Sequence, residues 1–453
     1  MFSPFLSRLP TTLPVRLRSA SARLKSTINP TGESFTSAAP RLTLPTAFTA
    51  NPGRAGAALC LSSAGIITVL ISVGGLTRLT KSGLSMTYWK PTQILPPQTY
   101  DEWMLEFDGY KSFPEFAQRQ NMTLDEFKSI YYWEWGHRIL GRVVGAWYGG
   151  GLALLAVTKN IPVGYGPRLT GLLVLGGAQG AVGWWMVQSG LGEDRRGDRK
   201  EIRVSPYRLA SHLTVAFATY TGLVWTGLEL LYPKTARASA AKLVADKIKG
   251  SKGVIKELAR FRRLALLSTA LTAVTVTSGA FVAGNDAGNA YNDWPYMNGQ
   301  FVPWEDMIDP AIDGPVYRNI FETTAMVQFN HRNLAYATSA AVAATVAYET
   351  TLKTTLAKAN LSSILTPQVT RGLYVMGGLA VTQVSLGIST LMLYVPVHLA
   401  ATHQLGSLAL LTSGLFLSHS VRYLGTAVAK AGGKKVAEKA VEEGARKVVK
   451  AAS

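Results

Sequence analysis

The chain has 453 residues, 47% of them hydrophobic, and a formal net charge of +19 at pH 7. In a soluble protein this charge would indicate nucleic-acid binding, but here the basic residues lie between long apolar segments, which excludes nucleic acid in favour of a lipid bilayer. The single cysteine, Cys60, excludes an intramolecular disulfide and redox chemistry on a thiol pair.

The N-terminal segment has the composition of a mitochondrial presequence. Its start, from position 1 to position 32, contains five basic side chains, no acidic one and many Ser, Thr and Leu. A disordered tail is the alternative, but it would not be expected to lack acids. We therefore predict that residues 1–56 are a presequence and linker, which places the protein in the mitochondrial inner membrane.

Eight apolar segments are long enough to cross a bilayer, whose hydrocarbon core of about 30 Å takes roughly 20 helical residues. They are residues 57–79, 137–157, 168–188, 209–231, 264–284, 331–350, 371–394 and 397–419. We expect an N-terminal group of four helices in residues 57–231 and a C-terminal group of four in residues 264–420. A basic linker, residues 232–263, joins them, and a basic tail, residues 421–453, follows.

The charges of the connections predict the orientation in the membrane. The linker 232–263 holds ten Lys or Arg and two acids, whereas the connection 285–330 holds seven acids and one base. The connection 80–136 holds eight acids and five bases. Because basic connections stay on the inner side, both termini are expected in the matrix and the two acidic loops in the intermembrane space.

The two groups of segments are related in sequence. Glu134–Arg138 matches Gln328–Arg332, and a further histidine follows each of these segments at a similar interval. The histidines are His137 and His212 in the first unit, and His331 and His403 in the second. Each unit has an even number of segments, so both enter the membrane in the same direction. This predicts an all-α membrane protein of two tandem four-helix bundles related by a pseudo-twofold axis along the membrane normal.

Other residues extend the repeat. The matched positions are Gly75 with Gly279, Trp89 with Trp294, and the segment around Gln179 with one close to Gln383. The similarity between the units therefore includes more than the histidines.

Two histidines in apolar surroundings in each unit suggest two haem sites, because neutral imidazole is a strong axial ligand for iron. The second and fourth helices of a bundle run parallel and can present their histidines to opposite faces of one porphyrin. We therefore predict that His137 pairs with His212, and His331 with His403, in the outer half of the bilayer. Zinc and copper also accept imidazole, but they do not need the Gly-rich helix faces near Gly141, which close helix packing would also explain.

Arg138 and Arg332 directly follow the first histidine of each unit. They are candidates to bind haem propionates, with phospholipid head groups as the alternative. His398 and His419 have no partner in the repeat and are interpreted as interfacial or hydrogen-bonded residues rather than metal ligands. The two long outer loops, 80–136 and 285–330, are expected to cap the sites.

The units differ beside the first histidine. Glu134 precedes His137 by three positions, and Gln328 precedes His331 by the same interval, which is nearly the same helix face. A carboxylate can accept a proton and an amide cannot titrate, so catalysis is expected in the N-terminal bundle and a permanent electron-transfer haem in the C-terminal bundle. The alternative is that Glu134 only pairs with an arginine or tunes an imidazole.

Several segments together resemble the haem A synthase family of the mitochondrial and alphaproteobacterial type. They are residues 74–86, 89–91, 96–97 and 134–138 in the first unit, and Asn330–Arg332 and His403–Gln404 in the second. The resemblance covers roughly residues 57–420. It implies an oxidoreductase that converts the C8 methyl group of haem O to a formyl group by successive hydroxylations, giving haem A for cytochrome c oxidase.

The resemblance also implies roles for the site residues. Haem b would lie between His331 and His403, and the substrate haem O between His137 and His212, with Glu134 as the essential acid. It further implies a ferredoxin-type electron donor, since the chain has no flavin or dinucleotide motif. Delivery from haem O synthase and formation of a homo-oligomer are left open.

Two other functions fit part of the pattern. A di-haem b-type electron-transfer cytochrome would explain the four histidines, but it would more naturally place haems near both membrane faces. A transporter built from repeats would use the same histidines and Glu134 for proton coupling, but its usual broken helices near the midplane are not evident.

Overall fold

The computed structural model describes residues 51–86, 88, 94–192, 202–232, 234–312 and 314–432. All of them belong to one compact unit. These residues form helices and loops. The β-structure among them is one isolated antiparallel bridge between Met297 and Gln300. The predicted presequence, Trp89 and the end of the basic tail lie outside the described residues.

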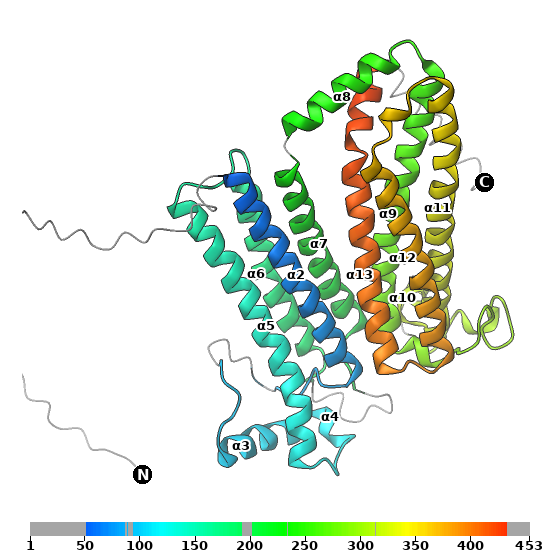
Figure 1. Ribbon diagram of the computed structural model, residues 1–453. Coiled ribbons are helices and arrows are strands. Elements are labelled where there is room, and N and C mark those ends of the chain that lie inside the picture. The colour runs from blue at the N-terminus through cyan, green and yellow to red at the C-terminus, as the bar shows by residue number, and fades with distance from the viewer. Residues whose placement is uncertain are drawn as a thin grey trace, which may run out of the picture. The chain divides into compact units, whose positions relative to one another are not determined.

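Four long helices in the N-terminal half pack in a ring. They are α2 (Pro52–Leu79), α5 (Leu124–Val157), α6 (Gly166–Gln188) and α7 (Pro206–Leu231). Helix α2 packs against α5 and α7, and α6 packs against the same two helices (Figure 1). Helices α5 and α7 therefore occupy opposite corners of this ring.

Four long helices in the C-terminal half pack in the same cyclic order. They are α9 (Lys252–Gly284), α11 (Thr324–Lys358), α12 (Pro367–Met392) and α13 (Val397–Ser420). Helix α11 packs against α9 and α12, and so does α13. The two rings meet where α7 packs against α9 and where α13 packs against α2 and α7.

Four of these helices, α2, α5, α9 and α12, are long and apolar enough to cross a membrane by length and composition. Apolar side chains also fill the space between helices. One buried cluster includes Leu59, Leu169 and Leu223 of the N-terminal ring, and another includes Phe261, Leu352 and Leu373 of the C-terminal ring.

Short helices complete the connections. They are α3 (Tyr100–Lys111), α4 (Pro114–Ala117), α8 (Lys234–Ile248), η2 (Ala287–Asn289), η3 (Trp304–Asp306), η4 (Val316–Arg318), α10 (Asn319–Glu322) and η5 (Ser362–Ile364). Helices α3 and α4 lie in the loop between α2 and α5. The buried aromatic rings of α3, Trp103, Phe107 and Tyr110, pack against Phe127 and Tyr131 of α5.

The helix that carries His137 begins earlier than its apolar segment predicts. It starts at Leu124, not at residue 137, and Thr123 and Glu126 form a capping box at its N-terminus. The segment from Leu124 to the residue before His137 is amphipathic and packs on the aromatic cluster of the outer loop. Hydropathy alone cannot detect such an extension, because polar residues interrupt it. His137 therefore lies about 20 Å along the helix from its start.

Candidate functional site

The four histidines of the repeat lie on helices at opposite corners of the two rings. His137 lies on α5 and His212 on α7, whereas His331 lies on α11 and His403 on α13. Within each pair the two side chains are close enough to interact electrostatically. The fold thus brings together the two histidines of each half.

Each imidazole lies against a glycine of the neighbouring helix. We describe each contact by the distance between a Cβ atom added to the glycine and Cε1 of the histidine. This distance is 2.7 Å for Gly74 and His137, 2.9 Å for Gly183 and His212, 3.3 Å for Gly279 and His331, and 2.9 Å for Gly387 and His403. Real Cβ atoms essentially never approach within 3.0 Å, so three of the four positions require glycine while the ring stays in place.

The glycine contact corrects one match in the repeat. The sequence repeat pairs Gly75 with Gly279, but Gly74 is the residue that faces the first histidine. The interval from Gly74 to Gly279 is also the interval from Trp89 to Trp294.

Two of the four glycines were not found by sequence reasoning. They are Gly183 and Gly387, which lie against the second histidine of each pair. A signal for them exists in the sequence, since the interval between them equals that between Gln179 and Gln383.

A glutamine supports the second histidine of each pair. Gln179 on α6 donates from Nε2 to the carbonyl oxygen of His212 at 2.8 Å, and Gln383 on α12 donates to the carbonyl oxygen of His403 at 2.9 Å. Because the same contact recurs in both halves, the repeat includes the groups that hold the histidines as well as the histidines themselves.

The first histidines differ in their support. Ser278 Oγ lies 2.7 Å from Nδ1 of His331, and Val73 stands at the equivalent position of the N-terminal half. Within the described part of the chain, the Nδ1 atoms of His137 and His403 are buried without a hydrogen-bond partner. In both imidazole rings Nδ1 lies nearer than Nε2 to the glycine of the neighbouring helix, which leaves Nε2 as the nitrogen better placed to bind a ligand.

The donor set fits an iron porphyrin better than a metal held by protein alone. No group of three or more His, Cys, Asp or Glu side chains that could hold a metal ion is found among the described residues. A protein-held zinc site needs three or four such ligands, whereas a porphyrin supplies four nitrogens itself and takes one axial imidazole from each side. Two histidines per ring of helices therefore suit haem.

Glu134 is buried, with 3% of its surface exposed, and both carboxylate oxygens have donors. Oε2 accepts from the Ser85 hydroxyl and from the backbone N–H of Met86, each at 2.8 Å. Oε1 accepts from Arg138 at 2.6 Å. These donors compensate the buried charge and fix the position of the carboxylate one helical turn from His137.

Gln328 makes the complementary contact in the second half. Its Nε2 donates to the carbonyl oxygen of Tyr291 at 2.7 Å, and Tyr291 is the position that the repeat relates to Met86. The residue before Tyr291 is Ala290, where the first half has Ser85. A carboxylate accepts from its loop and an amide donates to its loop, so the difference between the halves extends to the groups around it.

The two arginines contact the outer loops. Arg138 donates to the carbonyl oxygen of Met86 at 3.3 Å in addition to its ion pair with Glu134, and Arg332 donates to the carbonyl oxygen of Pro295 at 2.6 Å. Arg332 also stacks on Phe301, with 5.0 Å between the guanidinium carbon and the ring centroid. Both guanidinium groups therefore tie a loop to the helix that carries the first histidine.

The two remaining histidines lie apart from the pairs. His398 is exposed near the start of α13. His419 is buried near the end of the same helix, in ring contact with Trp225 and Tyr232. Neither faces a histidine of the repeat in the contacts described.

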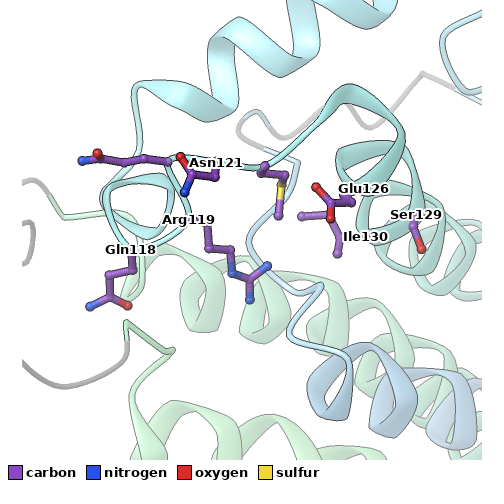
Figure 2. Close-up of a pocket in the computed structure, with 8 residues that line it drawn as sticks. Gln118, Arg119, Asn121, Glu126, Ser129 and Ile130 are labelled. Carbon is purple, nitrogen blue, oxygen red and sulfur yellow. The ribbon is translucent and has the colours of Figure 1, made fainter.

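A hollow on the outer loop is separate from the histidine pairs. It is lined by Gln118, Arg119, Gln120, Asn121, Met122, Glu126, Ser129 and Ile130. Figure 2 shows these side chains around the junction of the loop after α4 with the start of α5. Six of its eight lining residues are polar, and none of them is a histidine.

The fold and the site define a helical membrane protein in which four internal histidines form two pairs. The sequence pattern of the COX15-CtaA family, described as cytochrome oxidase assembly protein, matches residues 57–415. The chain therefore belongs to this family.

Curated relatives agree with this assignment. The chain is 40% identical over 362 residues to heme A synthase COX15 of Arabidopsis thaliana, covering 80% of this chain and 73% of the relative. It is 41% identical over 363 residues to heme A synthase of Paracoccus denitrificans, covering 79% and 85%. It is 39% identical over 377 residues to a heme A synthase-mitochondrial ferredoxin fusion protein of Schizosaccharomyces pombe, covering 81% and 60%.

Proposed function

We propose that this chain is a haem A synthase that oxidises the C8 methyl group of haem O to a formyl group in its N-terminal ring of helices. Family membership and about 40% identity to heme A synthases support the reaction. The one observation that supports the choice of half is the buried carboxylate of Glu134 beside His137, where the second half has Gln328. Residues 57–231 would then form the catalytic domain.

The C-terminal ring, residues 264–420, would hold a permanent haem b between His331 and His403. The hydrogen bond between Ser278 and His331 supports a fixed cofactor here, because it orients the imidazole before a ligand arrives. In the N-terminal half Val73 stands at the position related to Ser278, so His137 has no such side-chain hydrogen bond.

The eight long helices would each cross the membrane as two tandem bundles related by a pseudo-twofold axis. The shared cyclic order of packing and the recurring His–Gly contacts support this arrangement. Both termini, the linker 232–263 and the tail 421–453 would face the matrix, and the histidine pairs would lie toward the intermembrane space. The relatives include one fused to a mitochondrial ferredoxin, which supports the inner membrane of the mitochondrion and a ferredoxin-type donor.

When bound, the iron porphyrin supplies the oxidising chemistry. His137 and His212 would orient the substrate, and apolar helix faces would exclude bulk water. Glu134 would accept a proton released at the C8 carbon or from water. Ser85 holds the carboxylate in place, because its hydroxyl donates to Glu134 Oε2, and the same hydroxyl can accept from the carboxylic acid once Glu134 is protonated.

Arg138 and Arg332 would hold the outer loops over the sites. Propionate binding at these arginines stays a proposal, and it requires that a guanidinium N–H remain available beside the loop carbonyls. Haem O synthase is the proposed source of substrate, since haem O is too apolar to diffuse freely through water.

The test is to purify the chain from cells that make haem O and to identify its extracted haems by chromatography with mass detection. We expect haem b with haem A or its hydroxylated precursor from the wild type. Glu134→Gln should yield haem b and haem O, with haem A reduced by about 100-fold or more. Asp125→Asn, an exposed carboxylate on the same helix, is the matched control and should behave as wild type.

Two outcomes would contradict the proposal. Two equivalents of haem b per wild-type chain, with no haem A, would indicate an electron-transfer cytochrome. Full turnover by Glu134→Gln would show that the carboxylate is not essential.

A further inference from the structure

A polar side chain reaches from α13, beside His403, to α2 at the junction of the two rings. Gln404 follows His403 on α13, and its side chain lies against the backbone of α2. Its Nε2 donates to the carbonyl oxygen of Ile71 at 3.2 Å. A Cβ atom added to Gly75 would overlap Gln404 Oε1, so the glutamine occupies the space that a side chain at Gly75 would need.

The other end of this contact is the first histidine. Gly74 is the neighbour of Gly75 on α2, and it is the residue that lies against the ring of His137. One continuous path therefore leads from His403 along the chain to Gln404, across its amide to the turn Ile71–Gly75, and from Gly74 to His137. It contains one hydrogen bond and one van der Waals contact, and otherwise follows covalent bonds.

The repeat provides an internal comparison. The position related to Gln404 is Leu213, which follows His212, and the positions related to Gly75 and Ile71 are Ala280 and Val276. Leu213 and Val276 pack into one apolar cluster. The related junction is therefore apolar, and the glutamine contact exists on one side only.

We propose that Gln404 is a positioning residue that couples the two sites, so that electrons pass from the His331–His403 site to the His137–His212 site through this contact. This inference rests on the proposed function. With haem held at both sites, the second site would give up one electron and the first site would take it up, and an external one-electron donor of the ferredoxin type would then reduce the second site again. No bond forms or breaks along the path.

The absence of a side chain at Gly75 is what lets the Gln404 amide reach α2. Without a side chain at Gly75, the amide reaches the helix backbone and fixes the separation of α13 and α2. A leucine at the same place, as in the related junction, would fill the volume but would not hold the backbone at a defined point, because apolar contacts have no direction.

The experiment compares Gln404→Met with the wild type in the full chain loaded with haem b and haem O. Methionine nearly conserves volume and removes the amide. The first readout is the melting temperature and the haem content per chain. The second, which does not depend on catalysis, is the rate at which one electron equilibrates between the two haems, followed from their low-spin electron paramagnetic resonance signals after a pulse of reductant. The third is haem A formed per chain.

We expect Gln404→Met to retain both haems and its melting temperature, while electron equilibration and haem A formation both become slower than in the wild type, because the separation of α13 and α2 is no longer fixed. Gly75→Ala displaces the same amide from the opposite side and should reproduce the effect. Gly177→Ala is the matched control, since a Cβ atom there meets nothing within 4 Å.

Wild-type equilibration rates in either Gln404→Met or Gly75→Ala, with haem retained, would overturn the coupling role. Loss of haem in both variants would overturn it as well, because Gln404 would then be needed only for structure. If the wild type forms no haem A, the proposed function is refuted. If electron equilibration is nevertheless slower in Gln404→Met than in the wild type, the coupling role of Gln404 still holds.

Discussion

Glycines opposite the histidines set the geometry of both pairs at the level of single residues. An imidazole edge can approach a helix this closely only where the helix has no Cβ atom, and the four contacts are alike in kind but not in distance. Gly74 is the tightest, at 2.7 Å, and Gly279 the loosest, at 3.3 Å. The proposed substrate site between His137 and His212 is therefore expected to be the more sensitive to a side chain at this position.

Gly74→Ala should push the His137 ring away and weaken haem binding at the first site. Overpacking of this kind costs about 1–3 kcal/mol, which corresponds to roughly a 5- to 150-fold loss of affinity. Haem O titration of the purified chain, followed by absorbance, measures it. Gly279→Ala should have a smaller effect on the second site, and an equal or larger effect there would contradict the argument from contact distance.

The outer cap, formed by α3, α4 and the start of α5, contains a buried carboxyl group whose pKa is shifted. Glu115 is buried, and it accepts from the Tyr110 hydroxyl at 3.1 Å and pairs with Arg119 at 3.3 Å. Burial raises the pKa of Glu115 from 4.5 to about 7. Arg119, Arg203 and the bond from Tyr110 lower this pKa in part, and the charge of Glu134 raises it further.

The cap should lose stability as pH rises from about 4.5 to 7. In this window the folded state binds a proton at Glu115 that the unfolded state has released, so unfolding becomes easier with increasing pH. Glu115→Gln keeps the group neutral and should flatten the dependence. Hydrogen exchange of residues 100–131 on both sides of this window measures it, with the exposed Asp108→Asn as control. An unchanged slope in Glu115→Gln would assign the dependence to another group.

At the scale of the whole molecule, a buried carboxylate ties the two rings together at the end away from the outer loops. Glu229 of α7 pairs with Arg168 of α6 and with Arg422 just beyond α13. Glu229 has 3% of its surface exposed, whereas the side chains of Arg168 and Arg422 are 47% and 26% exposed. The arginines can thus regain water when the pair is broken.

Glu229→Gln should lower the stability of the junction by about 1–3 kcal/mol, because removing one partner of a fully buried pair costs about 3–5 kcal/mol and the exposure of the arginines reduces that figure. Thermal unfolding in detergent measures the change, with the exposed Asp125→Asn as control. No change relative to this control would show that apolar packing alone holds α13 against α7.

Local features of the sequence were sufficient to predict much of the fold. The predicted ends near residues 79, 157, 188, 231 and 284 agree with the helices because long apolar runs and the breaks between them are local properties. Three helices start at least seven residues earlier than predicted. Helix α5 begins at Leu124, α9 at Lys252 and α11 at Thr324, whereas the apolar segments start at positions 137, 264 and 331. In those stretches charged or polar residues lower the hydropathy while the apolar face still packs.

The sequence by itself determined the four histidines, the repeat and the difference between Glu134 and Gln328, because each is visible as residue type and spacing. Only the tertiary structure decided that Gly74 and not Gly75 faces His137, that Ser85 and Met86 hold Glu134, and that Gln404 lies on α2. The last contact joins residues 333 positions apart. Such contacts depend on how helices turn about their axes when they pack, and a periodic pattern specifies which face is apolar without specifying which atom it meets.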